Sequence, residues 1–200
     1  MYGLTIDNVL AAEITTADGQ TRVLTADNEP DLFWAIRGGG GNFGVVSKFQ
    51  YQLYPFERKL LSGMLVWPVG QARAALEFYA EWSQGLTREL YVGPVMATMP
   101  DGTAIVAMEV VYNGDPAKGE KELAPLRAIG TPMVDGILMQ DYKVMQTKED
   151  AATAHGIRSY AKNGMVKKFT QGLVDDMIGA FIPDPRAAIF TYTCGEAVEV

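Results

Sequence analysis

The residues that most suggest chemistry are a run of four glycines at positions 38–41. Gly39, Gly41 and Gly44 match the spacing G-x-G-x-x-G, in which a loop cradles the diphosphate of a dinucleotide. That motif needs a strand before the loop and a helix after it, because the helix start holds the diphosphate. Here a predicted helix precedes the glycines and a predicted strand follows them. The sequence therefore argues against a Rossmann-type site.

The glycine run still needs a physical reason, because glycine costs chain entropy. One explanation is a tight crossing from helix to strand against a neighbouring sheet. The other is a bare backbone surface that touches a large planar ligand. The two explanations are compatible, and the sequence leaves both open.

Other reactive side chains are scarce. The chain has one histidine, His155, and one cysteine, Cys194. One of each cannot supply the soft ligands of a zinc or copper site, so we expect no bound metal. No intramolecular disulfide can form, which favours a reducing compartment and a cytoplasmic location. The sequence also lacks G-x-S-x-G, which argues against a serine hydrolase.

Two strands are predicted near the N-terminus. Residues 9–16 and 22–25 alternate as strands joined by the turn Asp18-Gly19. Along the first strand, three apolar side chains are expected to share one face: Leu10, Ala12 and Ile14.

A short helix, the glycine loop and a third strand follow. Asp27 or Asn28 is expected to cap the helix, with Pro30 in its first turn and Gly38 ending it. The third strand covers residues 45–53. This order is the one that conflicts with a dinucleotide fingerprint.

Longer elements are predicted beyond residue 58. The strands are expected over residues 60–67, 90–99, 103–112 and 187–194, and the helices over residues 71–84, 116–128 and 170–180. Residues 131–148 are rich in methionine, which suits either core packing or an adaptable pocket wall. Hairpins and helices without a strict β-α-β period indicate an α+β fold, with helices covering one face of an antiparallel sheet.

Composition and charge exclude several classes of protein. The net charge is −7 and the isoelectric point is near 4.8, which argues against nucleic-acid binding because little positive charge is available for phosphates. No apolar run reaches the roughly 18–20 residues of a membrane helix, so no membrane partner is expected. The first residues show no signal peptide.

Three segments carry a family resemblance: Tyr2–Val9, Asp18-Gly19 and Asp31–Val46. In that order they closely resemble the berberine bridge enzyme-like FAD-linked oxidoreductases, whose FAD-binding domain is of the vanillyl-alcohol oxidase, or PCMH, type. The match is nearly continuous over residues 2–55 and looser beyond residue 60.

The resemblance implies two domains in an internal fragment. Residues 1–57 would be the C-terminal part of the FAD-binding domain, and residues 58–200 a substrate-binding domain truncated at its C-terminus. An FAD lobe with the phosphate-binding loop, and with the histidine that often carries covalent flavin, would precede residue 1. A segment that often carries catalytic groups would follow residue 200.

The cofactor that the resemblance implies is FAD in the complete protein. The stretch Tyr2–Val9 would pass beside the flavin and the adenine, largely through backbone contacts. This places four residues close to the cofactor: Gly3, Leu4, Asn8 and Val9. His155 and Cys194 lie outside the stretches that match flavin attachment sites.

Hydride transfer to a flavin also requires a base that accepts a proton. Candidates on the predicted sheet are Glu109, Tyr112 and Tyr142. Alternation along the strand places Glu109 and Tyr112 on opposite faces, so only one of them can face a flavin. The sequence assigns no catalytic base.

Two functions remain open. One is a fragment of an FAD-dependent oxidoreductase that oxidises a small alcohol, sugar-like or amine substrate, with the chain alone inactive. The other is a stand-alone, non-catalytic domain that binds a small molecule or another chain. Strands 9–16 and 45–53 would normally pair with or pack on the missing lobe, so we expect the chain to form homo-oligomers through these surfaces.

Overall fold

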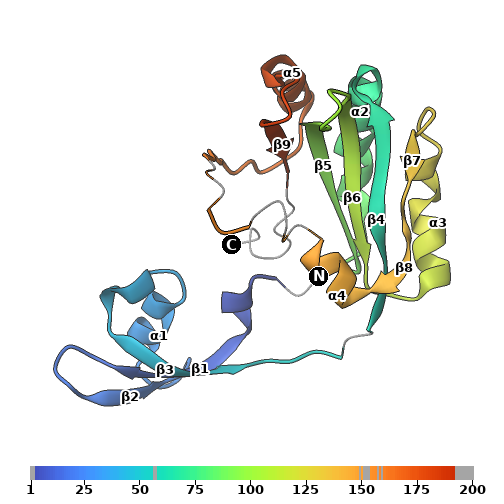
Figure 1. Cartoon of the computed structure of the whole chain (residues 1–200). Helices are drawn as coiled ribbons and strands as arrows, with labels where there is room; N and C mark the ends of the chain where they lie inside the picture. The colour runs from blue at the N-terminus through green and yellow to red at the C-terminus, as the bar shows by residue number, and fades with distance from the viewer. Residues whose placement is uncertain are drawn as a thin grey trace. The chain divides into compact units, whose positions relative to one another are not determined.

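The computed structural model describes residues 3–55, 58–148, 150, 154–156, 158 and 160–191. The chain divides after Pro55 into two compact units, and each has its own hydrophobic core (Figure 1). Helices and antiparallel strands occur in both, which confirms the predicted α+β class. Within the described part of the chain, no helix combines the length and apolarity needed to cross a membrane.

The N-terminal unit is built on a three-stranded antiparallel sheet in the order β2-β1-β3. Its strands are β1 (Val9–Thr15), β2 (Thr21–Leu24) and β3 (Val45–Tyr51). The strands expected to pair with a missing lobe, β1 and β3, pair with each other. The central strand β1 is paired along both edges, so the expectation of an exposed β1 edge is wrong. Among the described strands of this sheet, β2 and β3 form the edges.

A small core lies between this sheet and helix α1 (Pro30–Ile36). Val9, Ile14 and Leu24 pack there against Phe33. Leu10 does not join them and is 46% exposed, contrary to the predicted strand face. The reason is a register shift between Val9 and Ala11 in the pairing with β3, because a bulge residue turns its side chain out of the regular alternation.

The start of α1 also differs from the prediction. Glu29, in a left-handed conformation with φ of 55°, occupies the N-cap, and Pro30 is the first helical residue as expected. Asn28 instead donates its side-chain amide to the Val23 carbonyl, which ties the turn back to β2. Asp27 is likewise outside the cap position. Neither predicted cap forms.

The C-terminal unit contains a six-stranded antiparallel sheet in the order β7-β4-β6-β5-β9, with β8 also paired to β4. Its long strands are β4 (Lys59–Pro68), β5 (Leu90–Thr98) and β6 (Ala104–Tyr112). The short ones are β7 (Val134–Asp135), β8 (Leu138–Asp141) and β9 (Ala188–Phe190). The predicted β5–β6 hairpin is confirmed, as is the end of β4 at Pro68.

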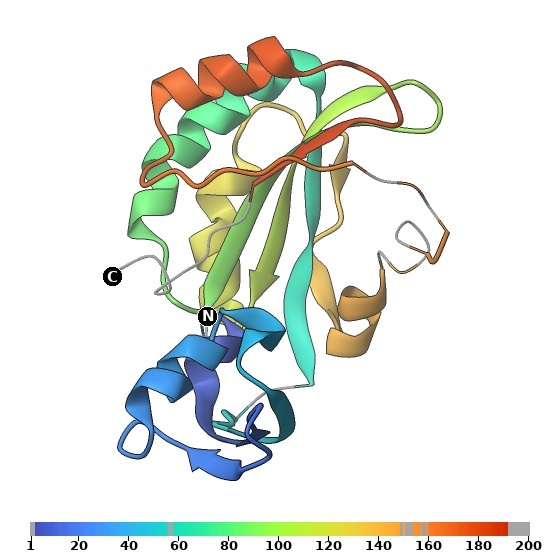
Figure 2. The same ribbon diagram turned by 90° about the vertical axis from the view of Figure 1, so that its left-hand side faces the viewer.

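Among the described residues, four α-helices accompany this sheet: α2 (Ala72–Trp82), α3 (Pro116–Arg127), α4 (Tyr142–Thr147) and α5 (Gln171–Ala180). Helices α2 and α3 lie on one side of the sheet (Figure 2), and α2, α3 and α5 share one core with it. Asp115 caps α3 as predicted, since its carboxylate accepts the Lys118 N–H at 3.0 Å. The three helices that share this core, α2, α3 and α5, therefore cover one face of the sheet.

The main core alternates along the strands. Every second residue of β6 from Val106 to Tyr112 faces the helices. Two aromatic side chains in this core pair their polar atoms: the Tyr79 hydroxyl donates to the Val92 carbonyl at 3.0 Å, and the Trp67 indole donates to the Ile129 carbonyl at 2.8 Å. Burial raises the pKa of Tyr79 to about 12.

Two expectations about the C-terminal half need correction. The methionine-rich stretch forms β7, β8 and α4, and Met133 and Met139 are exposed, so they are not core packing. The strand expected over 187–194 is β9, which covers only 188–190 because only three of its residues pair with β5. Residues 192–194 lie outside the described residues.

Candidate functional site

The four residues expected near the cofactor lie in and beside a single turn of 3-10 helix, Thr5–Asn8, which leads into β1. Gly3, with φ of 74°, begins the turn in a conformation that other residues rarely adopt. Leu4 follows as an exposed residue, Asn8 ends the turn, and Val9 starts the strand. The structure thus brings all four together on one short backbone segment.

Internal hydrogen bonds fix the shape of this turn. The Leu4 N–H donates to the Asp7 carboxylate at 2.8 Å, and the Asp7 N–H donates to the Leu4 carbonyl at 3.0 Å. The Asn8 amide also donates to the Leu4 carbonyl, at 2.9 Å. This reciprocal pattern holds the backbone in one conformation before any ligand binds.

Burial separates the roles that these residues can play. The Val9 side chain is buried in the core against Phe33, so Val9 can contact a ligand only through its backbone. Gly3 has no side chain, and Asn8 uses its side chain to close the turn. A segment of this kind suits a cofactor that is held mainly through backbone contacts.

The glycine loop lies between α1 and β3, with a short 3-10 turn at Gly40–Asn42. No helix begins after it within residues 43–55, which confirms that it is not a Rossmann loop. A β-carbon at Gly39 would collide with the Phe43 ring and the Ala35 carbonyl, and one at Gly44 would collide with the Thr15 carbonyl. The tight crossing therefore explains these two glycines.

Gly40 and Gly41 are different. A β-carbon at either position would meet no described atom within 4 Å beyond its chain neighbours, and both residues are exposed. Gly40 needs glycine for its φ of 68°. Packing does not account for Gly41, which leaves the second explanation, a backbone surface kept clear for a ligand, open at this position.

A hollow of about 650 Å³ lies in the N-terminal unit between the residue 5–8 turn and the glycine loop. Sequence reasoning did not identify it, because it joins residues about thirty positions apart. The exposed Trp34 ring and the Arg37 guanidinium contribute to its wall. Arg37 stacks over Phe33, with 4.8 Å from the guanidinium carbon to the ring centre. The hollow is thus mainly apolar, with Arg37 and Asp7 as its charged lining residues, and it lies beside the predicted cofactor segment.

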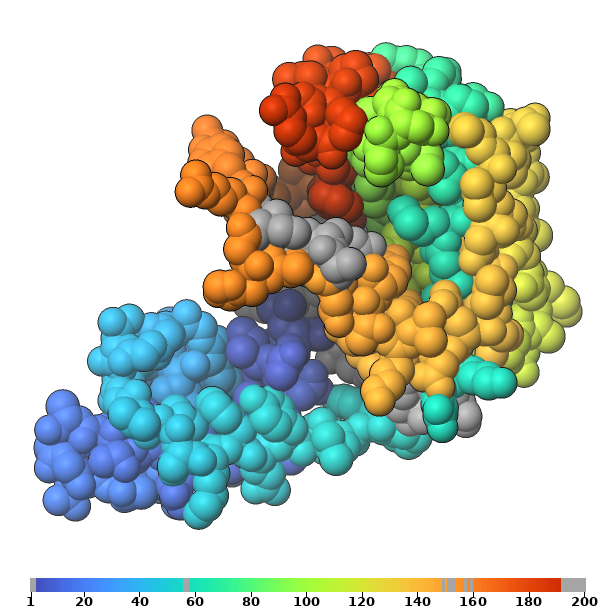
Figure 3. All heavy atoms as spheres, viewed as in Figure 1, coloured from blue at the N-terminus to red at the C-terminus, as the bar shows by residue number. Residues whose placement is uncertain are grey.

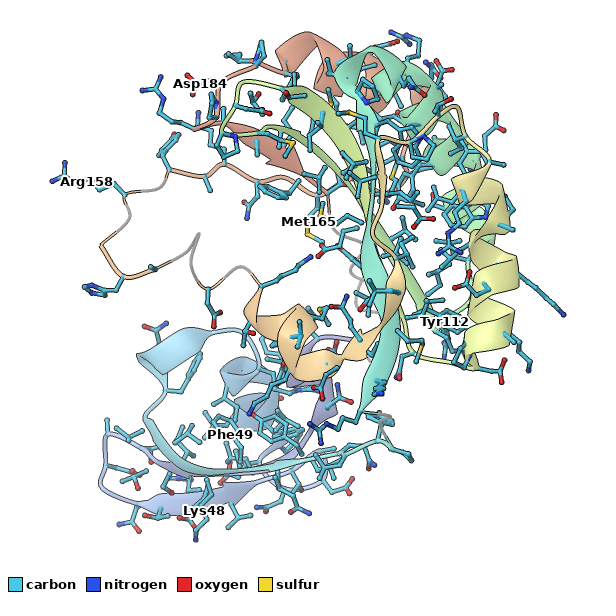
Figure 4. All side chains as sticks on the ribbon, turned by 45° about the vertical axis from the view of Figure 1, so that its right-hand side comes forward. Lys48, Phe49, Tyr112, Arg158, Met165 and Asp184 are labelled. Atoms are coloured by element: carbon cyan, nitrogen blue, oxygen red, sulfur yellow. The ribbon has the colours of Figure 1, made fainter. Side chains whose placement is uncertain are left out.

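The candidate bases in the C-terminal unit lie apart, as alternation predicts. Tyr112 is buried on the helix side of the sheet (Figure 4), where burial and then the nearby carboxylates of Glu122, Glu89 and Asp115 raise its pKa. Both effects oppose deprotonation of the Tyr112 hydroxyl, which argues against a role as a base. The Tyr142 hydroxyl on α4 hydrogen-bonds to the Gln146 side chain at 2.9 Å.

Glu109 lies on the opposite face of the sheet and forms an ion pair with Lys148, just after α4. Sequence reasoning missed Lys148, because 39 positions separate the two residues and no local pattern links them. Of the three candidate bases, Glu109 is the one that the structure places on the sheet face opposite α2 and α3, beside a second charged group at the end of α4.

The single histidine is not part of either arrangement. His155 is exposed in a turn. Figure 3 shows orange atoms, from described residues near positions 150–170, standing out from the body of the C-terminal unit. Cys194 lies outside the described residues. Within the described ranges, no group of three His, Cys, Asp or Glu side chains is arranged to hold a metal ion.

No family model matches the chain. Its sequence is 33% identical over 147 residues, 70% of its length, to (R)-6-hydroxynicotine oxidase of Paenarthrobacter nicotinovorans, and covers 31% of that protein. It is 25% identical over 201 residues to an FAD-linked oxidoreductase of Dictyostelium discoideum, which corresponds to 98% of this chain and 44% of that protein.

The solved structures that resemble this chain are of the same kinds of protein as these sequence relatives. The crystal structure of 6-hydroxy-D-nicotine oxidase from Arthrobacter nicotinovorans matches with a TM-score of 0.66 at 30% identity, over 78% of this chain and 35% of that one. A berberine bridge enzyme-like protein of Physcomitrella patens shares the fold, with a TM-score of 0.61 at 17% identity over 70% of this chain and 30% of that one. The chain therefore spans less than half the length of these relatives. By sequence and fold it is homologous to part of the berberine bridge enzyme-like FAD-linked oxidoreductases.

Proposed function

We propose that this chain is part of an FAD-dependent oxidoreductase that oxidises a small hydroxylated or amine substrate by hydride transfer to the flavin. The observation that carries the proposal is the preformed turn at residues 3–9, in a chain whose relatives are FAD-linked. Residues 1–57 would be the C-terminal part of the FAD-binding domain, and residues 58–200 the substrate-binding domain.

Each residue of the turn has a separate part in this proposal. Gly3 and Leu4 offer exposed backbone beside the cofactor, while Asn8 closes the turn through the Leu4 carbonyl. Val9 anchors the segment in the core. FAD, when bound, supplies the acceptor for the hydride, and the protein supplies binding and orientation.

Both substrate types are kept because the relatives differ. One relative is named for 6-hydroxynicotine, and a structural neighbour with a TM-score of 0.60 at 24% identity is named a chitooligosaccharide oxidase. The likeness to the chitooligosaccharide oxidase supports the fold alone. Neither name assigns a substrate to this chain.

A second candidate is a stand-alone, non-catalytic domain that binds a small molecule or another chain. The observation that favours it is that each of the two units has its own core. Exposed apolar side chains of the N-terminal unit, such as Trp34, Val45 and Leu53, would then support self-association. This second function requires no flavin.

The test of the proposal is the flavin content of the protein expressed from its complete gene, compared between two variants. Asp7→Ala removes the acceptor of the Leu4 N–H and loosens the turn, whereas Asp27→Ala removes an exposed carboxylate of the same unit outside it. We expect about tenfold weaker FAD retention for Asp7→Ala, because a hydrogen bond to a charged group contributes about 1.5–3 kcal/mol. Asp27→Ala should match the parent protein.

Absence of FAD from the complete protein, before and after incubation with the cofactor, would refute the proposal. The absorbance spectrum of this chain alone, recorded after incubation with FAD and gel filtration, then shows whether its two units hold FAD by themselves. A flavin band would mean that these two units suffice to hold the cofactor. A colourless, well-folded chain would mean that FAD binding requires additional protein.

A further inference from the structure

Residues 160–168, between α4 and α5, form a basic segment without regular secondary structure. The segment carries three exposed lysines, Lys162, Lys167 and Lys168, and the sequence has no aspartate or glutamate from residue 151 to residue 174. Because the whole chain has a net charge of −7 and this segment contributes +3, the rest of the chain carries −10. Positive charge is thus concentrated in one short stretch of an acidic protein.

The basic segment has no polar partners within its own unit. Among the described residues, none of its three lysines forms an ion pair, and the backbone of residues 160–168 forms no hydrogen bond. Apolar side chains accompany the lysines: Tyr160 is 83% exposed and Met165 is 78% exposed. Aromatic residues and methionine are enriched where proteins bind one another. The composition and exposure of the basic segment therefore suit a surface that another protein covers.

Phe169 fixes the end of the basic segment against α2. Its ring meets the ring of Tyr79 edge-on, with 5.0 Å between the two ring centres, and it packs against the main core. Thr170 then caps α5, because its hydroxyl accepts the Leu173 N–H at 3.3 Å. The basic segment therefore ends where α2 and α5 meet.

Helices α2 and α5 lie side by side (Figure 2). Their outer surface carries four carboxylates, here called the acidic ridge: Glu77, Glu81, Asp175 and Asp176. Arg73 pairs with Glu77 at 3.2 Å and with Asp175 at 2.8 Å. Glu81 and Asp176 are exposed and form no ion pair with any residue that the structure describes. The acidic ridge therefore keeps two negative charges that can accept cations.

We propose that the basic segment of one copy of this chain binds the acidic ridge of a second copy, so that two chains form a symmetric dimer through their C-terminal units. The two charged surfaces lie on the same unit and are joined through Phe169 and Thr170. A two-fold axis between two copies therefore makes the same contact twice, as a closed dimer requires. Tyr160 and Met165 add apolar contact to the attraction between charges.

The distribution of charge favours a second copy over an anionic lipid surface. A negatively charged membrane attracts the basic segment but repels the rest of the chain, which carries −10. Each exposed ion pair contributes little, and salt screens it, so a dimer of this kind weakens as salt is added. Association through the exposed apolar residues of the N-terminal unit would not weaken in this way.

The experiment is analytical ultracentrifugation of this chain over a range of concentrations, at about 0.02 M and about 0.5 M sodium chloride. We expect a dimer whose dissociation constant is at least about tenfold larger at the higher salt concentration. Two charge-reversed variants test the two surfaces: Lys167→Glu with Lys168→Glu, and Glu81→Lys with Asp176→Lys. Each should weaken the dimer about tenfold or more at low salt, because the reversed charges repel each other.

An equimolar mixture of the two charge-reversed variants is the most informative sample. In a mixed dimer, the reversed basic segment faces the reversed acidic ridge, and the two unreversed surfaces face each other. Both contacts are then restored, so we expect the mixture to dimerise as the parent chain does. A loss of association caused by unfolding would not be restored by mixing, and the melting temperature of each variant checks that it is folded.

Lys118→Glu with Lys121→Glu is the matched control, because it reverses two exposed lysines of α3 and changes the net charge by the same amount. It should dimerise like the parent chain. A parent chain that is monomeric at every concentration in low salt would overturn the proposal, as would a dimer that is unaffected by salt or a mixture that stays monomeric. Monomers that sediment with phosphatidylserine vesicles would assign the basic segment to a lipid surface and would also overturn it.

This dimer does not depend on the proposed function. The basic segment and the acidic ridge both lie in the C-terminal unit, whereas the turn proposed to contact FAD lies in the N-terminal unit. Absence of flavin from the complete protein would refute the oxidoreductase and leave the dimer intact. A monomeric chain would refute the dimer and leave the oxidoreductase intact.

Discussion

Two polar arrangements, one in each unit of the chain, are held together in opposite ways. In the N-terminal unit, the turn at residues 4–8 satisfies itself through partners three or four positions apart. In the C-terminal unit, the pair of Glu109 and Lys148 joins residues 39 positions apart across a sheet. The turn at residues 4–8 can therefore form locally. The ion pair between Glu109 and Lys148 can form only once the whole C-terminal unit has folded.

The hydrophobic cores of the two units also differ, because the N-terminal core is much the smaller. Four buried residues form the centre of the N-terminal core, against nineteen in the C-terminal core. Small domains bury little surface on folding and are marginally stable, so we expect the N-terminal unit to have a small free energy of unfolding. We therefore expect a core substitution of similar size to destabilise the N-terminal unit more than the C-terminal unit.

The largest expected effect comes from emptying each core. Phe33→Ala should cost about 3–5 kcal/mol, which exceeds what a core of this size can supply, so residues 9–51 should lose their protection from hydrogen exchange. Leu76→Ala should cost about 2–5 kcal/mol but leave the long strands protected. Equal loss of protection in both units with either variant would show that they unfold as one.

A smaller effect is expected in the loop between α1 and β3, where Gly44 is required by close packing and Gly41 is not. Gly44→Ala should destabilise the N-terminal unit by about 1–3 kcal/mol, because it combines a φ of 147° with a collision at Thr15. Gly41→Ala should change the free energy of unfolding by no more than about 0.5 kcal/mol. Chemical denaturation checks both, and a large loss for Gly41→Ala would show that packing governs that position too.

The smallest expected effect is on the stability of the N-terminal unit at acidic pH. Hydrogen bonds from Thr16, the Gln20 N–H and Arg22 lower the pKa of Asp18 to about 2, from an ordinary 3.8. Because the folded-state pKa is depressed, the stability contributed by Asp18 is present above pH 3.8 and is lost as pH falls through about 2. Asp18→Asn should flatten the pH dependence of the melting temperature of the N-terminal unit in that window. An unchanged dependence would mean that this carboxylate is not coupled to folding.

Much of the fold was predictable because its signals are local. Alternation over nine residues gave both strands of the β5–β6 hairpin, and Asp115-Pro116 marked the start of α3. The opposite orientation of Glu109 and Tyr112 followed from the same alternation.

The failures share a cause in tertiary context. Leu10 leaves the core because of how β1 pairs with β3, which no single strand reveals. The caps at Asp27 and Asn28 did not form because Asn28 found a partner in β2. The Lys148 partner of Glu109 and the hollow beside Trp34 likewise depend on residues that only the folded chain brings together.

The most direct test of the oxidoreductase assignment is the flavin absorbance of the protein from its complete gene, recorded without oxygen while neutral hydroxylated compounds and amines are added. We expect a flavin band that bleaches as substrate is oxidised. A complete protein that carries no flavin, or whose flavin band does not respond to any compound of either class, would contradict the assignment.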